Sequence, residues 1–258
     1  MYLDHYRPEE REFTADLAHK IQFVERSYRP ELTHFFNPRQ QVIAKQLLGN
    51  SETLKLVWDG GYEGAENQRL LICPYYEEVD RSVLELTLIE VEYPKKFEKL
   101  SHRKLLGSLL SQGIQRDRLG DILQDGERWQ FIVEKDLAPY LMTQVQRIGH
   151  ASVHLQEVPF SQLLDRKEDG QSFQISVASL RQDLLLSEGF HLSRQKVKVA
   201  FDNREVKCNW VLASKPSHEV QVGDVLSLRH YGRLKLEAVL SETKKGKLRL
   251  QVTRYSNQ

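Results

Sequence analysis

The middle of the chain contains six short apolar segments, and their order restricts the fold more than any other feature of the sequence. Their hydrophobic spacing follows the order strand, helix, strand, strand, helix, strand. The segments are Val83–Val91, His102–Ser111, Leu119–Leu123, Trp129–Glu134, Leu137–Arg147 and Ala151–Val158. The turn-forming residues 124–127 predict a hairpin between the two middle strands. We therefore expect two helices on one face of a four-stranded antiparallel sheet.

This order of elements fits the split βαβ, or ferredoxin-like, arrangement, which also underlies a common RNA-binding module. That module stacks bases on a basic-aromatic motif of its sheet, and Trp129 and Phe131 alone do not supply the motif. We therefore predict a ferredoxin-like (RRM-like) domain over residues 80–160. Its open sheet face is interpreted as a surface for packing or protein contact, in preference to one for RNA.

The first part of the chain predicts helices followed by strands. An apolar stripe from Phe13 to Val24 has the three-to-four spacing of an amphipathic helix. A second helix is predicted over Pro38–Leu48, with Val42 and Leu47 facing inward and a glycine as its stop. Two short strands are expected over residues 54–58 and 70–74. We predict that residues 1–79 form a small α/β domain.

The charge of the chain is unevenly distributed. The net charge is +1. Residues 1–175 contain 22 lysines and arginines against 28 acidic residues, a net −6, whereas residues 176–258 contain 15 against 8, a net +7. The basic C-terminal third is therefore the expected partner of a polyanion. The acidic front part is expected to offer surfaces to protein partners.

Composition also indicates the compartment. No run of eighteen apolar residues occurs and the first residues are polar, so we expect neither a membrane span nor a secretory signal. The two cysteines, Cys73 and Cys208, lie far apart in the sequence, which predicts neither a disulfide nor a zinc site. We expect a cytoplasmic, monomeric protein that does not contact a membrane.

The C-terminal third carries a recognisable motif. Residues 179–187 and 192–198 have the pattern of two short helices joined by a turn at Gly189, and short strands follow. Together these segments resemble the S4 RNA-binding domain. The matching residues are Ser179, Arg181, Asp183, Ser187, Ser193, Arg194, Val206, Asn209, Gly223 and Asp224. The resemblance implies a C-terminal S4 (αL-type) RNA-binding domain with a C-terminal extension over residues 175–258. The polar, turn-rich stretch before it predicts an interdomain linker over residues 161–174. From the order of its elements we expect the whole protein to be of α+β class.

One departure from the S4 pattern concerns backbone conformation. The family has a glycine shortly before the first strand of the motif, where this chain has residues 202–205, Asp-Asn-Arg-Glu. We predict that Asn203 takes over the positive φ that the glycine supplies.

Basic side chains of this region are the candidate RNA contacts, because arginine and lysine bind phosphate oxygens. The candidates are Arg181, Arg194, Lys196, Lys198, Lys207, Arg229, Arg233, Lys235, Lys244, Lys245 and Lys247. The last three belong to a predicted hairpin with a basic tip. Nearby, Tyr231 is predicted to pack in the core or against the hairpin, with stacking on a base as the alternative.

Further motifs extend the resemblance over nearly the whole chain, to the YlmH family of bacterial S4-domain proteins. They are residues 104–110 (KLLGSLL), 113–116 (GIQR), 119–122 (LGDI), 176–181 (SVASLR), 231–233 (YGR) and 243–247 (TKKGK). The resemblance implies a non-enzymatic factor that binds rRNA and tRNA on the large ribosomal subunit. It also implies a role in ribosome-associated quality control of stalled nascent chains. The alternative is a protein-interaction adaptor linked to cell division, in which RNA binding is incidental.

The sequence predicts no catalytic residue, metal site or cofactor. It contains neither a GxGxxG loop after a strand nor a GxxxxGK[ST] loop. Asp121 has the wrong context for the catalytic aspartate of an S4-linked pseudouridine synthase, and we predict that it belongs to a strand. His150 and His154 have the spacing of two metal ligands on one strand face but lack a third ligand nearby.

Overall fold

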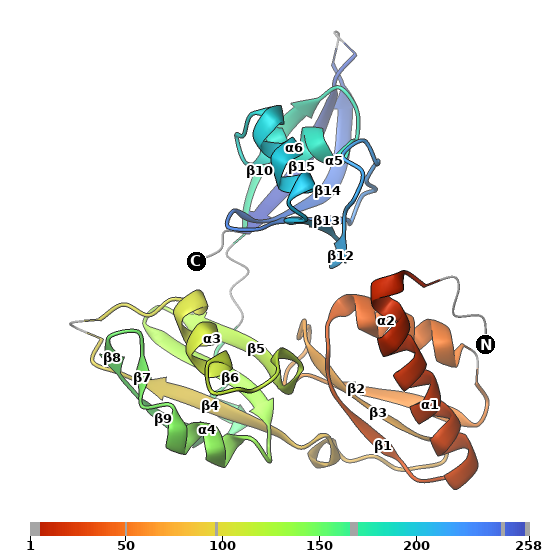
Figure 1. Cartoon of the computed structure of the whole chain (residues 1–258), viewed down its shortest axis with the longest axis vertical. Helices are drawn as coiled ribbons and strands as arrows, with labels where there is room; N and C mark the ends of the chain where they lie inside the picture. Colours follow the sequence, from red (N-terminus) through yellow and green to blue (C-terminus); the bar gives the residue numbers. More distant parts are fainter. Residues whose placement is uncertain (1–5, 50, 96–97, 166–169, 244–245, 256–258) are drawn as a thin grey trace. The chain divides into compact units, whose positions relative to one another are not determined.

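The computed structural model describes residues 6–49, 51–95, 98–165, 170–243 and 246–255. The chain forms two compact units, Met1–Arg166 (unit 1) and Lys167–Gln258 (unit 2) (Figure 1). Both contain helices packed on antiparallel sheets, so the predicted α+β class is confirmed. No helix in the described ranges is both long and apolar enough to span a bilayer.

The N-terminal segment of unit 1 is a helix pair on a three-stranded antiparallel sheet with the strand order β1-β3-β2 (Figure 1). After a short 3₁₀ turn, η2 (Pro8–Glu10), its elements are α1 (Arg11–Ser27), β1 (Glu31–Phe36), α2 (Pro38–Leu48), β2 (Leu54–Asp59) and β3 (Gln68–Pro74). The predicted stripe on α1 is buried against the sheet, in one core with Leu70 and Ile72. Because the sheet is antiparallel, this segment is α+β rather than α/β.

Helix α2 has the predicted bounds, Pro38–Leu48, and local signals at its start explain this agreement. Asn37 accepts the backbone N–H of Gln40, the Gln40 side chain bonds back to Asn37 N, and Pro38 occupies the first turn. The predicted inward face is wrong in part, because Val42 is 44% exposed and Ile43 and Ala44 are buried in its place. Strand β1 was not predicted at all.

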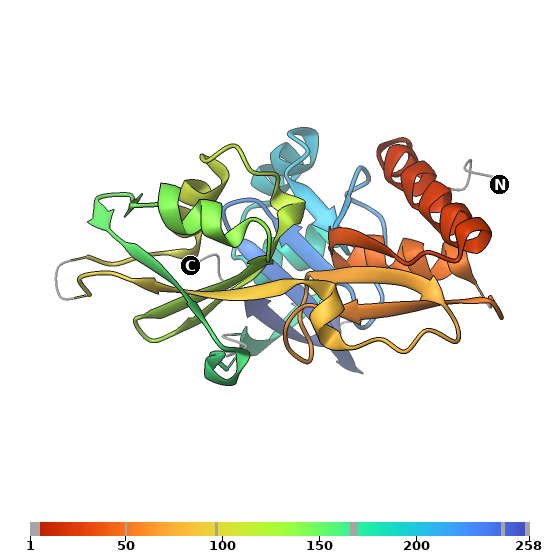
Figure 2. The ribbon, with the colours of Figure 1, turned by 90° about the horizontal axis from the view of Figure 1, so that it is seen from below.

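The middle segment has the predicted order of strands and helices. Its main elements are β4 (Leu86–Glu92), α3 (His102–Leu110), β5 (Leu119–Asp125), β6 (Arg128–Glu134), α4 (Ala138–Gln144) and β9 (His154–Val158). The four strands are antiparallel in the order β5-β6-β4-β9. Both helices lie on the same side of this sheet (Figure 2), on the face that carries Ile89 and Phe131.

The largest differences from the predicted boundaries in this segment occur at three places. Residues 81–84 form a 3₁₀ turn, η3 (Arg81–Leu84), so the first strand starts later than expected. The second helix ends at Gln144. The last predicted strand is split, because β8 (Ala151–Ser152) turns back to pair with β7 (Arg147–Ile148) before β9 begins.

The second face of the middle sheet is buried inside unit 1. Ile132 and Leu88 share a core cluster with Phe35 of β1. Gln130, which is fully buried, accepts the backbone N–H of Leu164 at 2.8 Å and donates to the carbonyl of Gln162 at 3.0 Å. Residues 160–164, including the 3₁₀ turn η5 (Phe160–Gln162), therefore cover this face. The interpretation of the face as a packing surface agrees with these contacts.

Asp121 joins the two segments of unit 1. Its carboxylate accepts hydrogen bonds from Tyr62 Oη at 2.6 Å, Glu66 N at 2.7 Å, Asn67 N at 3.0 Å and Asn67 Nδ2 at 2.6 Å. The side chain is buried, and it lies in β5 as predicted. The loop between β2 and β3 is thus anchored to the middle sheet.

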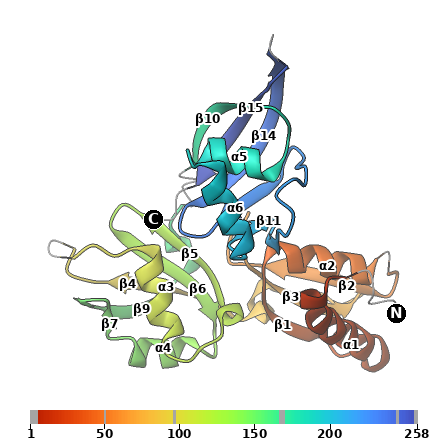
Figure 3. The same cartoon turned by 45° about the horizontal axis from the view of Figure 1, so that its top comes forward.

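Unit 2 is a six-stranded antiparallel sheet with two helices, α5 and α6, packed on one face (Figure 3). Its elements are β10 (Gly170–Val177), α5 (Gln182–Gly189), α6 (Arg194–Asp202), β11 (Val206–Cys208), β12 (Val211–Leu212), β13 (Val225–Leu228), β14 (Gly232–Glu242) and β15 (Leu248–Tyr255). The sheet order is β10-β15-β14-β13-β11-β12. The predicted linker over 161–174 is wrong for residues 170–174, because they pair with β15.

Two turns of unit 2 also differ from the prediction. Gly189 ends α5 and the left-handed residue of the turn is His191, with φ of 54°. A Cβ on Gly189 would lie 2.4 Å from a methyl carbon of Leu234, so this glycine permits close helix–sheet packing. After α6, the positive φ belongs to Arg204 (58°), while Asn203 has φ of −78°.

Candidate nucleic-acid interface

The start of α5 places Arg181 beside an acid of its own helix. Arg181 is the N-cap residue, and its Nε and Nη2 donate to the carboxylate of Asp183 at 2.9 and 2.8 Å. These hydrogen bonds, together with the charge of Asp183, raise the pKa of Arg181. The arginine predicted to contact RNA is therefore held in an ion pair.

Helix α6 presents two cations along one strip. Val197, Ala200 and Phe201 are buried in the core of unit 2. Arg194 and Lys198 are exposed and lie one helical turn apart. The helix begins at Ser193 as predicted, since the serine hydroxyl accepts the N–H of Lys196 at 3.3 Å. Arg194 and Lys198 therefore form a solvent-facing basic pair one turn apart on α6, which we call the α6 strip.

Three further candidates lie on the other face of the sheet. Lys207 pairs with Ser227, which in turn pairs with Arg233 of β14. The neighbours of these residues along the strands, such as Val206 and Leu234, are buried under the helices, so Lys207 and Arg233 point away from α6. Lys235, two residues further on β14, shares this face and lies 3.0 Å from Glu237. The predicted site is thus divided between two surfaces.

Arg233 also contacts an aromatic ring. Its guanidinium lies 5.6 Å from the ring centre of Trp210, a cation–π distance. Trp210 and Asn209 form the two-residue turn between β11 and β12, with φ of 64° and 48°. Sequence reasoning did not single out Trp210, and positive φ at such a bulky residue is rare.

The remaining candidates lie in turns. Arg229 is exposed in the turn between β13 and β14, and its backbone N–H donates to the backbone carbonyl of Glu205. Lys247 is exposed at the end of the β14–β15 hairpin, where its N–H donates to Thr243 Oγ1 at 3.0 Å. Lys244 and Lys245 lie outside the described residues.

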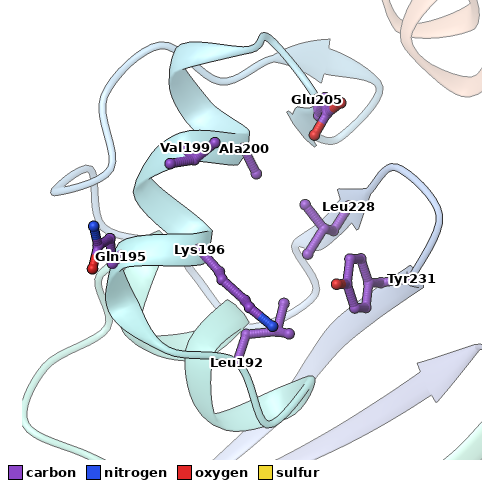
Figure 4. A pocket seen from close by; sticks show the side chains of 8 residues that line it. All are labelled: Leu192, Gln195, Lys196, Val199, Ala200, Glu205, Leu228 and Tyr231. Atoms are coloured by element: carbon purple, nitrogen blue, oxygen red, sulfur yellow. The ribbon is translucent and has the colours of Figure 1, made fainter.

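A hollow of about 370 Å³ opens between α6 and the turn that follows β13 (Figure 4). Its lining residues are Leu192, Gln195, Lys196, Val199, Ala200, Glu205, Leu228 and Tyr231. Lys196 therefore belongs to the hollow and lies on the other side of α6 from the α6 strip. Tyr231 is 44% exposed and its ring packs against Phe190 at 6.0 Å, so the predicted packing role describes only part of this side chain.

Unit 1 carries a basic stretch that sequence reasoning missed. Residues 94–104, PKKFEKLSHRK, contain five lysines and arginines against one glutamate. Lys95, Lys99, Arg103 and Lys104 are exposed around the start of α3. The signal was present in the sequence, but the net −6 summed over 175 residues concealed it.

The described residues offer little to the enzyme alternatives. Asp121 uses its carboxylate to hold a loop, as described above. No group of three or more His, Cys, Asp or Glu residues able to hold a metal occurs within the described ranges. Cys73 is buried, and burial raises the pKa of its thiol, which disfavours the reactive thiolate.

Comparison with known families assigns each part of the chain. Residues 9–77 match the model described as "YlmH, N-terminal", and residues 80–162 match "Putative RNA-binding domain in YlmH". Residues 171–256 match the C-terminal domain of mitochondrial transcription rescue factor 1.

Two individual proteins show the same relationship. The ribosome-associated protein quality control protein P2 of Bacillus subtilis (strain 168) is 35% identical over 250 residues, which cover 97% of each chain. A solved structure described as cell division protein ylmH from Streptococcus pneumoniae is 36% identical, with a TM-score of 0.54. The match covers 62% of this chain and 98% of that one.

Proposed function

This chain belongs to the YlmH family, and from that premise we propose that it is a ribosome-associated RNA-binding protein of nascent-chain quality control. It binds rRNA and tRNA on the large ribosomal subunit, and its action is binding rather than catalysis. The name of the Bacillus relative supports the quality-control role. The exposed basic residues of unit 2 support the mode of binding.

The α6 strip is the observation that carries this proposal. Arg194 and Lys198 stand one turn apart on the exposed surface of a helix whose inner side is buried. They belong to a region with a net charge of +7. Cations fixed at helical spacing bind successive phosphates of an RNA backbone without reading its sequence. Such binding gives an affinity that falls steeply with salt.

Unit 2 is, in this proposal, an S4-type domain. The two helices of the motif pack together on the sheet. The motif residues Asn209 and Asp224 are joined by a side-chain hydrogen bond of 2.7 Å, which links the turn after β11 to the start of β13. Two residues of the S4-like sequence pattern that are distant in the chain are therefore hydrogen-bonded in the fold.

The middle segment is proposed to be a ferredoxin-like domain that touches RNA by its basic stretch and not by its sheet. The sheet order β5-β6-β4-β9 supports the fold. One sheet face lies under the helices and the other lies under residues 160–164. The exposed side chains of Lys99, Arg103 and Lys104 remain available for phosphate contact.

Binding of the full-length protein to purified large ribosomal subunits tests the proposal. We expect tight binding that weakens steeply from low to high salt and strengthens when peptidyl-tRNA is present. The charge reversal Arg194→Glu with Lys198→Glu should abolish it. Lys215→Glu, an exposed lysine outside the α6 strip, should reduce binding only slightly. Equal binding by the two variants would refute the role of the α6 strip.

A second candidate function is an adaptor in cell division. The description of the Streptococcus relative and the net −6 of residues 1–175 favour it. In that case the full-length protein should bind a protein partner after RNase treatment. The charge reversal on α6 should leave that binding unchanged.

A further inference from the structure

We propose that the hollow beside α6 binds one unstacked nucleobase of an RNA loop, preferably one that carries an exocyclic amino group. This inference rests on the proposed RNA-binding function and adds a specific subsite to it. The α6 strip supplies contacts to phosphates, which do not depend on sequence. The hollow would supply the contact that depends on the base.

The walls of the hollow suit a flat apolar group. Leu192, Val199, Ala200 and Leu228 line it, and Val199 is 50% exposed although it is apolar. The volume of about 370 Å³ lies at the small end of the range of about 300–1,000 Å³ that is usual for small-molecule sites. An aromatic base fits this shape better than an extended chain does.

Tyr231 provides a fixed stacking surface. Its ring faces the hollow opposite α6 (Figure 4), and it rests on the ring of Phe190. The backbone is held by the hydrogen bond from Tyr231 N to the carbonyl of Leu228 at 3.0 Å and by the left-handed residue His230. A partly exposed aromatic ring with a fixed orientation stacks on a base at a low entropic cost.

The polar groups suit the rest of a nucleotide. Lys196 extends from α6 toward the side where Tyr231 lies (Figure 4), within reach of a phosphate. Glu205 is held by backbone hydrogen bonds to Ala200 and Arg229. Its carboxylate accepts hydrogen bonds only, so it favours the amino groups of adenine, cytosine or guanine over the carbonyls that dominate the edge of uracil.

The charge around the hollow favours a polyanion over a peptide. Lys196 belongs to the lining itself, and Arg229 directly follows Leu228 of the wall. Arg194 and Lys198 lie on the other side of α6, and the lining includes the single acid Glu205 among the described residues. A nucleic acid matches this site because its phosphates can bind the cations and its base can enter the apolar hollow.

The test uses full-length protein and a short RNA hairpin with one 2-aminopurine in its loop. Fluorescence of this base falls when it stacks, so wild-type protein should quench it. Tyr231→Ala should abolish the quenching and lower the affinity by about tenfold, the loss expected for one stacked base. Tyr231→Phe should retain both, and Val222→Ala, an exposed apolar residue away from the hollow, should behave like the wild type.

A second measurement tests base preference. Hairpins that differ in one loop nucleotide should bind more weakly with uracil than with adenine, cytosine or guanine. Glu205→Gln should reduce that difference, because an amide both donates and accepts. A purely structural role of Glu205 would not change a preference among bases.

The outcomes separate this proposal from the general one. If both wild-type and Tyr231→Ala protein bind the RNA and change the fluorescence of 2-aminopurine equally, the proposed base site is wrong. The proposed RNA-binding function would not be affected by that result. Absence of any RNA binding by the wild-type protein overturns both. Weaker binding of Tyr231→Ala to ribosomes, with unchanged binding to the isolated hairpins, shows that a protein occupies the hollow and also overturns the proposal.

Discussion

Asn209 donates its side-chain amide to the carboxylate of Asp224 at 2.7 Å, although fifteen residues separate them in the sequence. The Asn209 side-chain oxygen also accepts the N–H of Val225, and its backbone N–H donates to the carbonyl of Val225. Asp224 accepts the N–H of Gln221 in addition. Two separate parts of the S4-like motif therefore form one hydrogen-bonded junction between strands β11 and β13.

The first prediction concerns this junction. Asn209→Ala should lower the free energy of unfolding by about 2–3 kcal/mol, because it leaves the Asp224 carboxylate and the Val225 N–H without these partners. It also places alanine at a positive φ. Asn209→Gly removes the same hydrogen bonds without backbone strain and should cost less. Urea denaturation measures both variants, and wild-type stability in both would contradict the structural role of Asn209.

The second prediction concerns the ion pair at the start of α5. Asp183→Asn should raise the affinity for large ribosomal subunits at low salt, because it removes the negative charge and one of the two acceptor oxygens that hold the Arg181 guanidinium. The gain should shrink as the salt concentration rises. The same substitution in an Arg181→Ala background is the control. An equal gain there would show that Asp183 acts only by repelling RNA and that Arg181 makes no contact.

The third prediction concerns the anchor between the two segments of unit 1. Asp121→Ala should destabilise the protein by about 3 kcal/mol, since it removes the carboxylate that accepts hydrogen bonds from Tyr62, Glu66 and Asn67. Asp117→Ala, at an exposed position nearby, is the matched control and should unfold like the wild type. Unfolding in urea measures the difference. If Asp121→Ala also matched the wild type, the loop would not depend on this carboxylate.

The fourth prediction concerns stability at acid pH. The carboxylate of Glu90 accepts two hydrogen bonds from Arg128, at 2.9 and 2.7 Å, and these lower its pKa below the ordinary value of 4.5. Desolvation opposes this shift, and Gln130 adds to it. A carboxyl group with a lower pKa in the folded state contributes stability above the unfolded pKa. That stability is lost as the pH falls through the folded value.

Arg128→Gln should therefore reduce the loss of stability between pH 7 and about pH 3.5. Urea midpoints at the two pH values measure this loss, and the difference should be smaller in the variant than in the wild type. Lys135→Gln, an exposed cation of the same unit, should leave the difference unchanged. The idea fails if Arg128→Gln and the wild type lose the same amount.

Local signals explain why several elements could be predicted from the sequence. Helix α2 has its predicted bounds because a capping asparagine, a first-turn proline and a following glycine act within a few residues. The apolar residues of strand β13 show a similar local signal, since buried positions alternate along it. The order of elements in the middle segment follows from the same short-range periodicity.

Signals that depend on distant partners were missed. Strand β1 has no regular alternation and is ordered by pairing with β3. The inward face of α2 depends on which side the sheet covers, so Ile43 rather than Val42 is buried. Positive φ at Arg204 and His191 is imposed by how α5 and α6 are joined to the core, and residue preference alone pointed to other positions.

The sequence by itself determined that unit 2 is basic and which side chains carry that charge, because charge is a property of composition. It could not determine on which side of the sheet each cation lies. Arg194 and Lys198 lie on the side covered by the helices, whereas Lys207 and Arg233 lie on the opposite side. That division depends on which side of the sheet α5 and α6 cover. Tyr231, Glu205 and Lys196 come together for the same reason: packing, not spacing along the chain, brings the turn after β13 against α6.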